Sequence, residues 1–267
     1  MIPAADPGAA PPVEGGHDTT IVIPAKNEGR FISAVVQDAW AMRPRNSRMK
    51  FLVLDDASTD ETQQTLMALA QEVPLTVITH RQSLGFGGSL TDGILQADTQ
   101  WLLFVDADAQ YEPEDLKRFL TMPRDSHTLV SGWRTHRADP FVRIFISIVF
   151  MTMNRVAFGL RMKDITSSLK LIPAEPAKEI VRKVRYMNGS FWSEFMVRWM
   201  KAGYGFVEVP IKHLPRRDSR SKVFASGQLG RLMVHQFVGL LRLLRETSVT
   251  KDEGVSLSNP QLPRMTR

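Results

Sequence analysis

Four apolar, strand-like runs alternate with helix-like segments in the first part of the chain, and this alternation constrains the fold more than any other feature. The runs are TTIVIPA, KFLVLDD, LTVITH and WLLFVDAD, at residues 19–25, 50–56, 75–80 and 101–108. Helix-like segments follow from Glu28, from an N-cap at Ser58, Thr59 or Asp60, after the glycine-rich SLGFGG, and from Pro113. Because parallel strands need crossover helices of this kind, the sequence predicts an α/β fold with a mostly parallel, doubly wound sheet.

The second half of the chain continues this pattern less regularly. Strand-like runs occupy residues 128–134, 167–173 and 205–211. A long helix-like segment separates the first two runs, and further helices fit residues 175–184, 191–202 and about 227–246. The last of these helices is apolar over most of its surface, so it either packs in the core or lies in a membrane interface.

Polar and acidic side chains follow three strand-like runs of the first half. They are Asn27, Glu28, Asp55, Asp56, Asp106 and Asp108. One such pair is common in a simple turn. The carboxyl ends of parallel strands share one edge of a sheet, however, so all three groups converge if the predicted fold is right. Carboxylate oxygens suit Mg²⁺ or Mn²⁺, which accompany the diphosphate of a nucleotide.

The charge is distributed unevenly along the 267 residues. Residues 1–133 carry 10 Lys or Arg and 18 Asp or Glu, a net charge of −8, whereas residues 134–267 carry 24 and 10, a net charge of +14. This asymmetry favours a metal–carboxylate site that faces a phosphate-rich partner or a membrane surface. The sequence contains no helix-turn-helix, zinc-finger or RNA-binding signature, so we expect no nucleic-acid partner. Cysteine is absent, which excludes disulfides and thiolate sites.

The ends of the chain and its longest apolar run bear on localisation. The proline- and glycine-rich start lacks the features of a secretory signal, and we expect disorder over residues 1–17 and 247–267. The longest apolar run, Ile144–Met153, is shorter than the ~18–20 residues that span a bilayer. We therefore expect a cytoplasmic protein that makes peripheral contact with the cytoplasmic face of a membrane.

Four ordered motifs carry a resemblance to a known family. IPAKNE, VLDDASTDET, SLGFGGSLTDGI and DADAQYEPEDL lie in this order along the first half of the chain. The sequence resembles the family-2 inverting glycosyltransferases of the GT-A fold, and most closely the polyprenyl-phosphate sugar synthases such as dolichol-phosphate mannose synthase. The resemblance implies a single GT-A domain over residues 18–246. In it, residues 18–133 would bind a nucleotide sugar and residues 134–246 an acceptor.

The resemblance also implies roles for the residues that match these motifs. The donor, a GDP- or UDP-linked sugar, would contact Pro24, Asn27, Glu28, Asp55, Asp56, Asp106, Gln110, Arg216, Ser221 and Lys222. A Mg²⁺ or Mn²⁺ ion would be held by Asp106, Asp108 and Gln110. The expected catalytic set is Asp106, Asp108, Arg216 and Lys222, the last two in PRRDSRSK, which resembles a mobile loop that closes over donor phosphates. A solvated run of charges is the alternative interpretation of that loop.

Three residues of the second half are candidates for the acceptor site. SGWR resembles a phosphate-binding segment of the family that ends in Arg134, and Arg143 stands where the family often has a second arginine. Glu194 is a candidate acidic residue near the acceptor, although the polar face of an amphipathic helix also explains it. Ser168 and Ser219 replace glycines of the family pattern.

These residues predict a metal-dependent, inverting transfer of a sugar to a polyprenyl phosphate. A lipid phosphate attacks as an anion, whereas a hydroxyl acceptor needs a carboxylate such as Glu194 or Asp164 as general base. Two alternatives are transfer to a soluble hydroxyl acceptor in natural-product or polysaccharide assembly, and a nucleotide-sugar-binding protein without catalytic activity.

Overall fold

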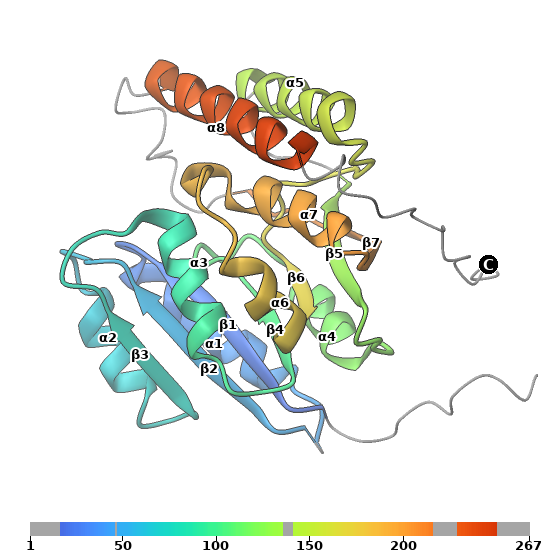
Figure 1. Cartoon of the computed structure of the whole chain (residues 1–267). Coiled ribbons are helices and arrows are strands. Elements are labelled where there is room, and N and C mark those ends of the chain that lie inside the picture. The colour runs from blue at the N-terminus through green and yellow to red at the C-terminus, as the bar shows by residue number, and fades with distance from the viewer. Residues whose placement is uncertain (1–16, 46, 136–140, 216–228, 250–267) are drawn as a thin grey trace, which may run out of the picture.

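A computed structural model describes residues 17–45, 47–135, 141–215 and 229–249 (Figure 1). Its strands are β1 (Thr19–Ala25), β2 (Met49–Asp55), β3 (Leu75–Thr79), β4 (Trp101–Phe104), β5 (Thr128–Arg134), β6 (Lys170–Pro173) and β7 (Gly205–Ile211). Its α-helices are α1 (Gly29–Ala41), α2 (Thr62–Leu69), α3 (Gly85–Gln96), α4 (Pro113–Thr121), α5 (Phe141–Phe158), α6 (Ala174–Val181), α7 (Phe191–Lys201) and α8 (Leu229–Val249). A short 3₁₀ helix, η1 (Asn188–Ser190), precedes α7.

These strands form one mixed sheet in the order β3-β2-β1-β4-β6-β5-β7. The first four pair in parallel, as the alternating sequence pattern predicts. β6 is antiparallel to both β4 and β5, while β5 and β7 are parallel. The predicted α/β class and the mostly parallel sheet are therefore confirmed, with β6 as the one reversed strand among those described.

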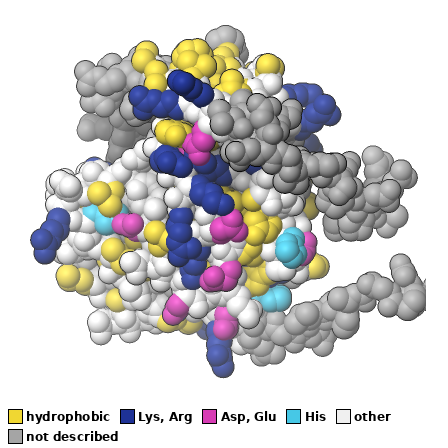
Figure 2. All heavy atoms as spheres, viewed as in Figure 1, with side chains coloured by type: hydrophobic (Ala, Val, Ile, Leu, Met, Phe, Trp, Pro, Cys, Tyr) yellow, Lys and Arg dark blue, Asp and Glu magenta, His cyan; other side chains and the backbone are white. Residues whose placement is uncertain are grey.

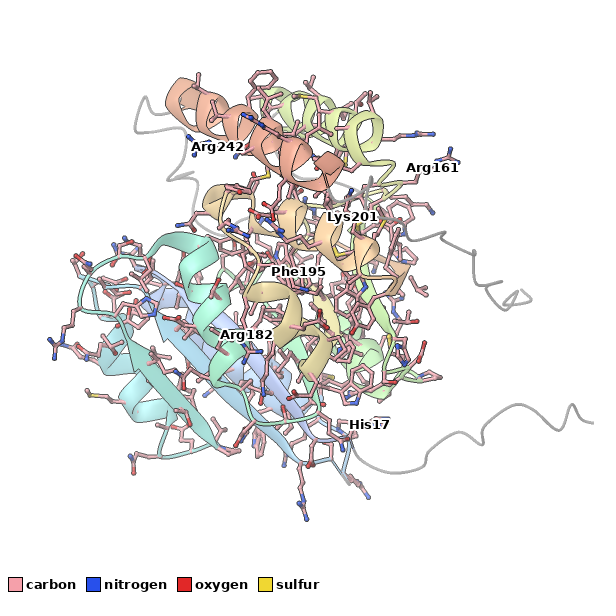
Figure 3. All side chains as sticks on the ribbon, viewed as in Figure 1. His17, Arg161, Arg182, Phe195, Lys201 and Arg242 are labelled. Carbon is pink, nitrogen blue, oxygen red and sulfur yellow. The ribbon has the colours of Figure 1, made fainter. Side chains whose placement is uncertain are left out.

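The helices cover both faces of the sheet, and the strands supply alternate side chains to each face. In β1, Ile21 and Ile23 pack with α1, α2 and α4, whereas Val22 points to the opposite face and packs with α3, α6 and α7. This alternation follows from the two-residue period of a strand. Phe195 of α7 is fully buried in the second of these layers (Figure 3).

Several element boundaries differ from the predicted ones, including the start of β6, which is Lys170 rather than position 167. β4 ends at Phe104 rather than at position 108, because its ladders to β1 and β6 both stop there, at Val22 and Lys170. The acidic motif therefore lies in a turn beyond the strand. α2 begins at Thr62, and Asp60 accepts a hydrogen bond from its backbone N–H (3.0 Å) one residue before the N-cap, Glu61. α8 continues to Val249, three residues beyond the predicted end.

α5 and α8 lie side by side at one end of the molecule (Figure 1). Figure 2 shows apolar side chains gathered there, with Lys and Arg side chains beside them. Among the side chains described in these two helices, the large apolar ones that are exposed are Ile148, Val149, Val156, Val234, Phe237, Val238 and Leu241. Within the described ranges, neither these helices nor any other combines the length and the apolar character that crossing a bilayer requires.

Gly93 provides a test of how closely α3 packs on the sheet. A Cβ atom at this position would lie 2.5 Å from Val22 Cγ1 of β1 and 3.1 Å from a methyl of Leu54. Alanine in mid-helix normally stabilises by about 1 kcal/mol relative to glycine. We expect Gly93→Ala to lower the free energy of unfolding by about 1–3 kcal/mol instead, because overpacking displaces the helix. Urea unfolding measures this.

Gly205→Ala is the matched control for this substitution. A Cβ atom at Gly205 would meet its nearest neighbour, Thr128 Oγ1, at an ordinary contact distance of 3.4 Å. This variant should therefore unfold close to the wild type. Equal stability of the Gly93→Ala variant and the wild type would contradict the close packing of α3 on β1.

Candidate active site

The backbone bends sharply just beyond the carboxyl ends of β1, β2 and β4. Among described residues other than glycine, positive φ angles occur at Asn27 (55°), Ala57 (56°) and Ala109 (56°), and each follows one of these strands. Holding such residues in this region costs on the order of 1–3 kcal/mol, and strain of this kind gathers at functional sites. All three predicted polar groups therefore lie on turns along one edge of the sheet.

The turn after β4 carries Asp106, Asp108 and Gln110. Both carboxylates are partly exposed. The hydroxyl of Tyr111 donates to Asp106 Oδ2 (2.9 Å), and it orients this carboxylate. Burial, followed by the charge of Asp106, raises the pKa of Tyr111 well above its ordinary value, so the phenol keeps the proton that it donates. The motif itself gave no reason to assign Tyr111 a role.

Gln110 joins this turn to the chain that follows β7. Its Nε2 donates to the carbonyl of Leu214 (2.9 Å), and the backbone N–H of Leu214 donates back to the carbonyl of Gln110 (2.9 Å). The described chain stops at residue 215, so the basic segment with Arg216, Ser221 and Lys222 lies outside the described residues. Its starting point is nevertheless fixed beside the acidic turn.

Asp55 ends β2, Asp56 follows it, and the two carboxylates hold two different loops. Asp55 accepts a hydrogen bond from the backbone N–H of Ser58 (3.1 Å). Asp56 accepts from the hydroxyl of Ser83 (2.6 Å) and from the backbone N–H groups of Leu84 (2.7 Å) and Gly85 (3.0 Å). Burial opposes the ionisation of Asp56, but hydrogen bonds from Ser83, from His80 and from these N–H groups outweigh it and hold its pKa below the ordinary value.

His80 is a buried residue of this site that the sequence did not single out. It follows β3, and its Nδ1 lies 2.9 Å from Asp56 Oδ1, while its Nε2 lies 3.2 Å from a carboxylate oxygen of Asp92. The same reasoning that found the acids at the other strand ends would have found His80 at the end of β3.

Pro24, Asn27 and Glu28 lie at the end of β1, next to the loop after β2. Asn27 Oδ1 accepts a hydrogen bond from the backbone N–H of Thr59 (2.7 Å), and Asn27 N–H donates to Ser58 Oγ (2.9 Å). Glu28 N–H donates to Thr62 Oγ1 (3.0 Å), and Glu28 is the N-cap of α1. The structure thus brings these three residues and Asp55, Asp56, Asp106, Asp108 and Gln110 to one edge of the sheet.

Arg134, at the end of β5, is bound on two sides of its guanidinium group. Its Nε and one terminal nitrogen donate to the two carboxylate oxygens of Asp164 (2.7 and 3.0 Å), and the same terminal nitrogen donates to Thr166 Oγ1 (2.7 Å). Both side chains of the ion pair are less than 10% exposed, at 8% and 4%. This geometry favours a supporting role in which Arg134 orders the 164–166 turn, over direct binding of an acceptor phosphate.

The two other acceptor candidates differ in what the structure describes. Arg143 lies in the first turn of α5, and its side chain is outside the described part of the chain. Glu194 is fully buried and accepts hydrogen bonds from three backbone N–H groups and from Arg198. Its oxygens are committed inside the protein, so its geometry favours a structural role rather than the predicted contact with an acceptor.

Lys170 is a fully buried cation beneath the edge that carries these acids. It opens β6 opposite Phe104, the last residue of β4. Its Nζ donates to Ser131 Oγ (2.8 Å) and to the carbonyl of Ser167, and it lies 5.1 Å from the ring centre of Trp192. Burial lowers its pKa to about 7, although the nearby carboxylate of Asp164 opposes this.

The acidic turn fits the coordination chemistry of a hard divalent cation. Mg²⁺ is usually bound in proteins by one or two carboxylates together with substrate phosphates and water. Asp106 and Asp108 supply two carboxylates on one turn, and Gln110 supplies an amide oxygen two residues further on. Within the described ranges no three acidic, histidine or cysteine side chains gather into a complete metal cage, so phosphates and water would have to complete the set.

Comparison with known proteins gives one matching family and several related proteins. The profile of the family described as glycosyl transferase family 2 matches residues 20–181. The chain is 27% identical over 223 residues to the undecaprenyl-phosphate mannosyltransferase of Micrococcus luteus, covering 80% of this chain and 90% of that protein. It is 28% identical over 232 residues to the polyprenol monophosphomannose synthase of Mycolicibacterium smegmatis, covering 83% and 85%.

A solved structure shares the fold at low sequence identity. It is glucosyl-3-phosphoglycerate synthase from Mycobacterium tuberculosis, in complex with Mn²⁺, UDP and glucosyl-3-phosphoglycerate. The TM-score is 0.62 at 16% identity, and the match covers 84% of this chain and 80% of that one. This likeness and the seven-stranded sheet confirm the predicted GT-A fold.

The buried ammonium of Lys170 predicts how stability depends on pH. Its folded-state pKa of about 7 lies below its ordinary value of 10.5. Between these values the unfolded chain binds more protons, so stability rises with pH. The free energy of unfolding of the wild type, relative to Lys170→Met, should rise by up to about 1.4 kcal/mol per pH unit between about pH 7.5 and 9.5. Urea unfolding at several pH values measures both free energies. A constant difference between the wild type and Lys170→Met across this pH range would contradict the prediction.

Proposed function

The chain belongs to glycosyl transferase family 2, and we propose that this glycosyltransferase moves a sugar from a nucleoside diphosphate to a polyprenyl phosphate, with a divalent metal and with inversion. The observation that carries the proposal is the convergence of the acids after β1, β2 and β4 on one edge of the sheet. Open α/β sheets bind nucleotides at this edge. The names of both relatives, which specify mannose and a polyprenyl phosphate, favour a mannosyl group and a lipid acceptor.

In the proposed donor site, the loops after β1 and β2 hold the nucleoside, and the turn after β4 holds the diphosphate. Pro24, Asn27, Glu28, Asp55 and Asp56 would line the base and ribose pocket. Asp106, Asp108 and Gln110 would hold Mg²⁺ or Mn²⁺. When bound, such an ion neutralises charge that develops on the departing diphosphate. The bond between Tyr111 and Asp106 would keep one carboxylate in place for this role.

The segment that begins beside Gln110 completes the proposed donor site. Arg216 and Lys222 would contact the diphosphate, most strongly as negative charge grows on it, and Ser221 would bind it as well. The hydrogen bonds between Gln110 and Leu214 support this assignment, since they start the basic segment next to the acidic turn.

The two candidate general bases, Asp164 and Glu194, are both engaged in ion pairs, and this bears on the nature of the acceptor. A hydroxyl acceptor needs a carboxylate that can take a proton, whereas a phosphate acceptor is already an anion. Asp164 is held by Arg134, and Glu194 by Arg198 and three backbone N–H groups. Since these two carboxylates are engaged in ion pairs, the geometry favours an anionic acceptor, and in the proposal Arg143 would position it.

The α5–α8 end of the molecule supports contact with a membrane that holds a lipid acceptor. Exposed apolar side chains of both helices occur there together with exposed Arg155 of α5. Arg161 and Arg242 are also exposed at this end (Figure 3). Helices that lie in a membrane interface combine an apolar surface with basic residues in this way. We therefore propose peripheral contact with anionic lipid through α5 and α8.

Transfer to a soluble acceptor is the second candidate. The solved structure with the shared fold contains glucosyl-3-phosphoglycerate rather than a lipid product. Incubating the protein with Mn²⁺, a GDP- or UDP-sugar, and either a polyprenyl phosphate in detergent or 3-phosphoglycerate separates the two candidates. Mass spectrometry of the products should show a glycosylated polyprenyl phosphate, whereas a sugar found only on the soluble acceptor would contradict the lipid proposal.

Asp108→Asn tests the metal site. The substitution removes one carboxylate from a partly exposed turn and keeps the size of the side chain, so we expect loss of metal-dependent transfer without loss of stability. Asp98→Asn is the matched control, because Asp98 is an exposed carboxylate paired with Lys50 at the opposite, amino end of β4. Transfer by the Asp108→Asn variant at the rate of the control would refute the assigned site.

Arg143→Ala tests the acceptor site. Losing a charge-assisted hydrogen bond to phosphate should raise the KM for polyprenyl phosphate on the order of 10-fold and leave the donor KM unchanged. Arg182→Ala, at an exposed arginine that follows α6 and has no role in the proposed site or membrane contact, is the control and should keep the wild-type KM. An unchanged acceptor KM, together with a rate that falls as a single carboxylate is protonated, would instead indicate a hydroxyl acceptor.

A further inference from the structure

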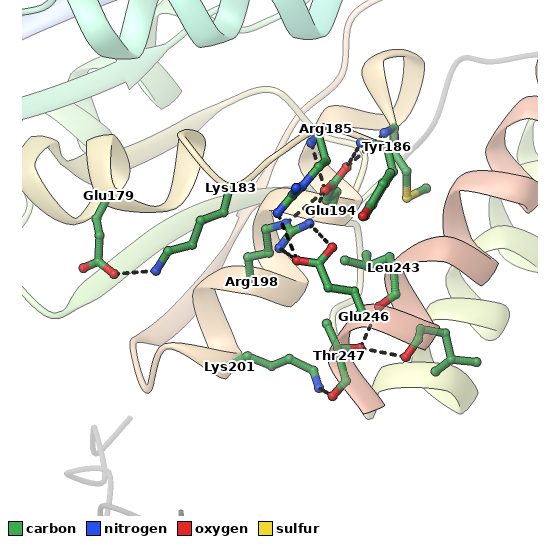
Figure 4. Close-up of polar contacts among 12 residues, drawn as sticks. Glu179, Lys183, Arg185, Tyr186, Glu194, Arg198, Lys201, Leu243, Glu246 and Thr247 are labelled. Atoms are coloured by element: carbon green, nitrogen blue, oxygen red, sulfur yellow. Dashed lines mark hydrogen bonds and ion pairs between the residues drawn. The ribbon is translucent and has the colours of Figure 1, made fainter. Parts of the chain in front are cut away.

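A short segment between α6 and α7 connects the C-terminal helix to the candidate donor site. This segment, residues 185–190, includes η1, and we refer to it as the strut. It touches α8 on one side and the first turn of α3 on the other. The network around its first residues, drawn in Figure 4, joins α7 and α8.

Glu194 fixes the start of the strut from inside the protein. One of its oxygens accepts from the backbone N–H of Arg185 (3.0 Å), and the other accepts from those of Tyr186 (2.7 Å) and Met187 (2.9 Å). Arg198 donates two further hydrogen bonds to the same carboxylate (2.9 and 2.8 Å). A buried carboxylate with this many donors holds its surroundings in one arrangement, because each bond lost would leave a polar group unpaired.

α8 packs directly against the same part of the strut. Glu246 accepts from Arg198 (3.1 and 3.2 Å) and from Arg185 (3.3 Å). A Cβ atom at Gly239 would lie 2.8 Å from the carbonyl oxygen of Tyr186 and 2.9 Å from Met187 Cγ. The backbones of α8 and the strut therefore touch, and the position of one constrains the other.

At its other end the strut holds the glycine-rich segment through Asn188. Asn188 Nδ2 donates to the carbonyl of Leu84 (2.9 Å), and its Oδ1 accepts from the backbone N–H of Gly88 (3.2 Å). A Cβ atom at Gly87 would lie only 2.6 Å from Asn188 Oδ1, so only glycine allows this approach. Asn188 thus satisfies one of the N–H groups that the first turn of α3 leaves without a helical partner.

Asp56 binds the same stretch from the opposite side. The N–H groups of Leu84 and Gly85 donate to its carboxylate, while the carbonyl of Leu84 accepts from Asn188. The start of α3 is therefore held between the strut and Asp56, which is a proposed nucleotide-binding residue. A shift of Asn188 changes the donors that orient Asp56.

We propose that Asn188 and Glu194 are positioning residues for the nucleotide, acting through Leu84–Gly88 on Asp56. This inference rests on the proposed function, in which Asp56 holds the base or ribose. It also gives Glu194 a role that the sequence did not predict. Contacts that displace α8 would reach the nucleotide through the strut, so the proposed membrane-facing helix and the donor site are mechanically linked.

Asn188→Ala is the main test, because Asn188 is exposed and the substitution leaves the core intact. Hydrogen exchange of the peptide that covers residues 83–88 should become faster as the Gly88 amide loses its acceptor. Calorimetry with GDP or UDP and Mn²⁺ should show the Kd of the bound nucleotide raised about 3- to 10-fold. Glu194→Gln should have the same two effects, and the acceptor KM should not change in either variant.

Lys201→Ala is the matched control. Lys201 lies on α7 like Glu194, and its Nζ donates to the carbonyl of Thr247 at the end of α8 rather than to the strut (3.0 Å). The Lys201→Ala variant should have a lower melting temperature, but the same hydrogen exchange in residues 83–88 and the same nucleotide Kd as the wild type. If the strut had only a structural role, the Asn188→Ala, Glu194→Gln and Lys201→Ala variants would all bind the nucleotide with the same Kd.

The two readouts separate failure of this inference from failure of the proposed function. If the wild type binds a nucleotide and Asn188→Ala binds it equally well, with unchanged exchange in residues 83–88, the positioning role is overturned. If the wild type binds neither GDP nor UDP in the presence of Mn²⁺, the proposed function fails, and the nucleotide role of the strut fails with it. In that case, faster hydrogen exchange of residues 83–88 in the variants would still show that the strut orders the start of α3.

Discussion

The parallel hydrogen-bonded ladders of β3, β2, β1 and β4 are the constraint on which the rest of the structure depends. Their register ends with Ala25 opposite Asp55 and Asp55 opposite Thr79, so β1, β2 and β3 finish at the same level, while β4 ends opposite Val22 and its acids follow on a turn. Every side chain that follows a strand is thereby delivered to one edge of the sheet. A slip of one residue would turn Ile21 and Ile23 out of one core layer and Val22 out of the other, so the buried apolar layers fix this register.

Two arginines of the second half are held in buried ion pairs. Arg134 and Arg198, which the net charge would count as available for a phosphate, are both held by buried carboxylates. Breaking such a pair leaves an unpaired buried charge and costs several kcal/mol, about 3–5 by analogy with other proteins. Arg134 and Arg198 therefore order turns and helices of the second half, and on the proposed function external phosphates would be bound by basic residues nearer the surface.

Much of the fold and part of the site followed from the sequence, for identifiable physical reasons. Apolar runs and strand-end acids are local signals, so the strands of the parallel sheet and the groups at Asp55, Asp56, Asp106 and Asp108 were predictable. The antiparallel insertion of β6 between β4 and β5 depends on long-range pairing that no local pattern encodes. The hydrogen bonds of Glu194 were missed although its partners are near in sequence: Arg198 lies four residues further on, and the N–H groups of the strut lie seven to nine residues before it.

The most direct measurement is a crystal structure with a nucleoside diphosphate and Mn²⁺, using anomalous diffraction at the manganese edge. The proposed function predicts an anomalous peak within coordination distance of both Asp106 and Asp108 and of the diphosphate oxygens, with the nucleoside beside Asp56. A nucleotide bound at another edge of the sheet, or a manganese peak that touches neither carboxylate, would contradict it.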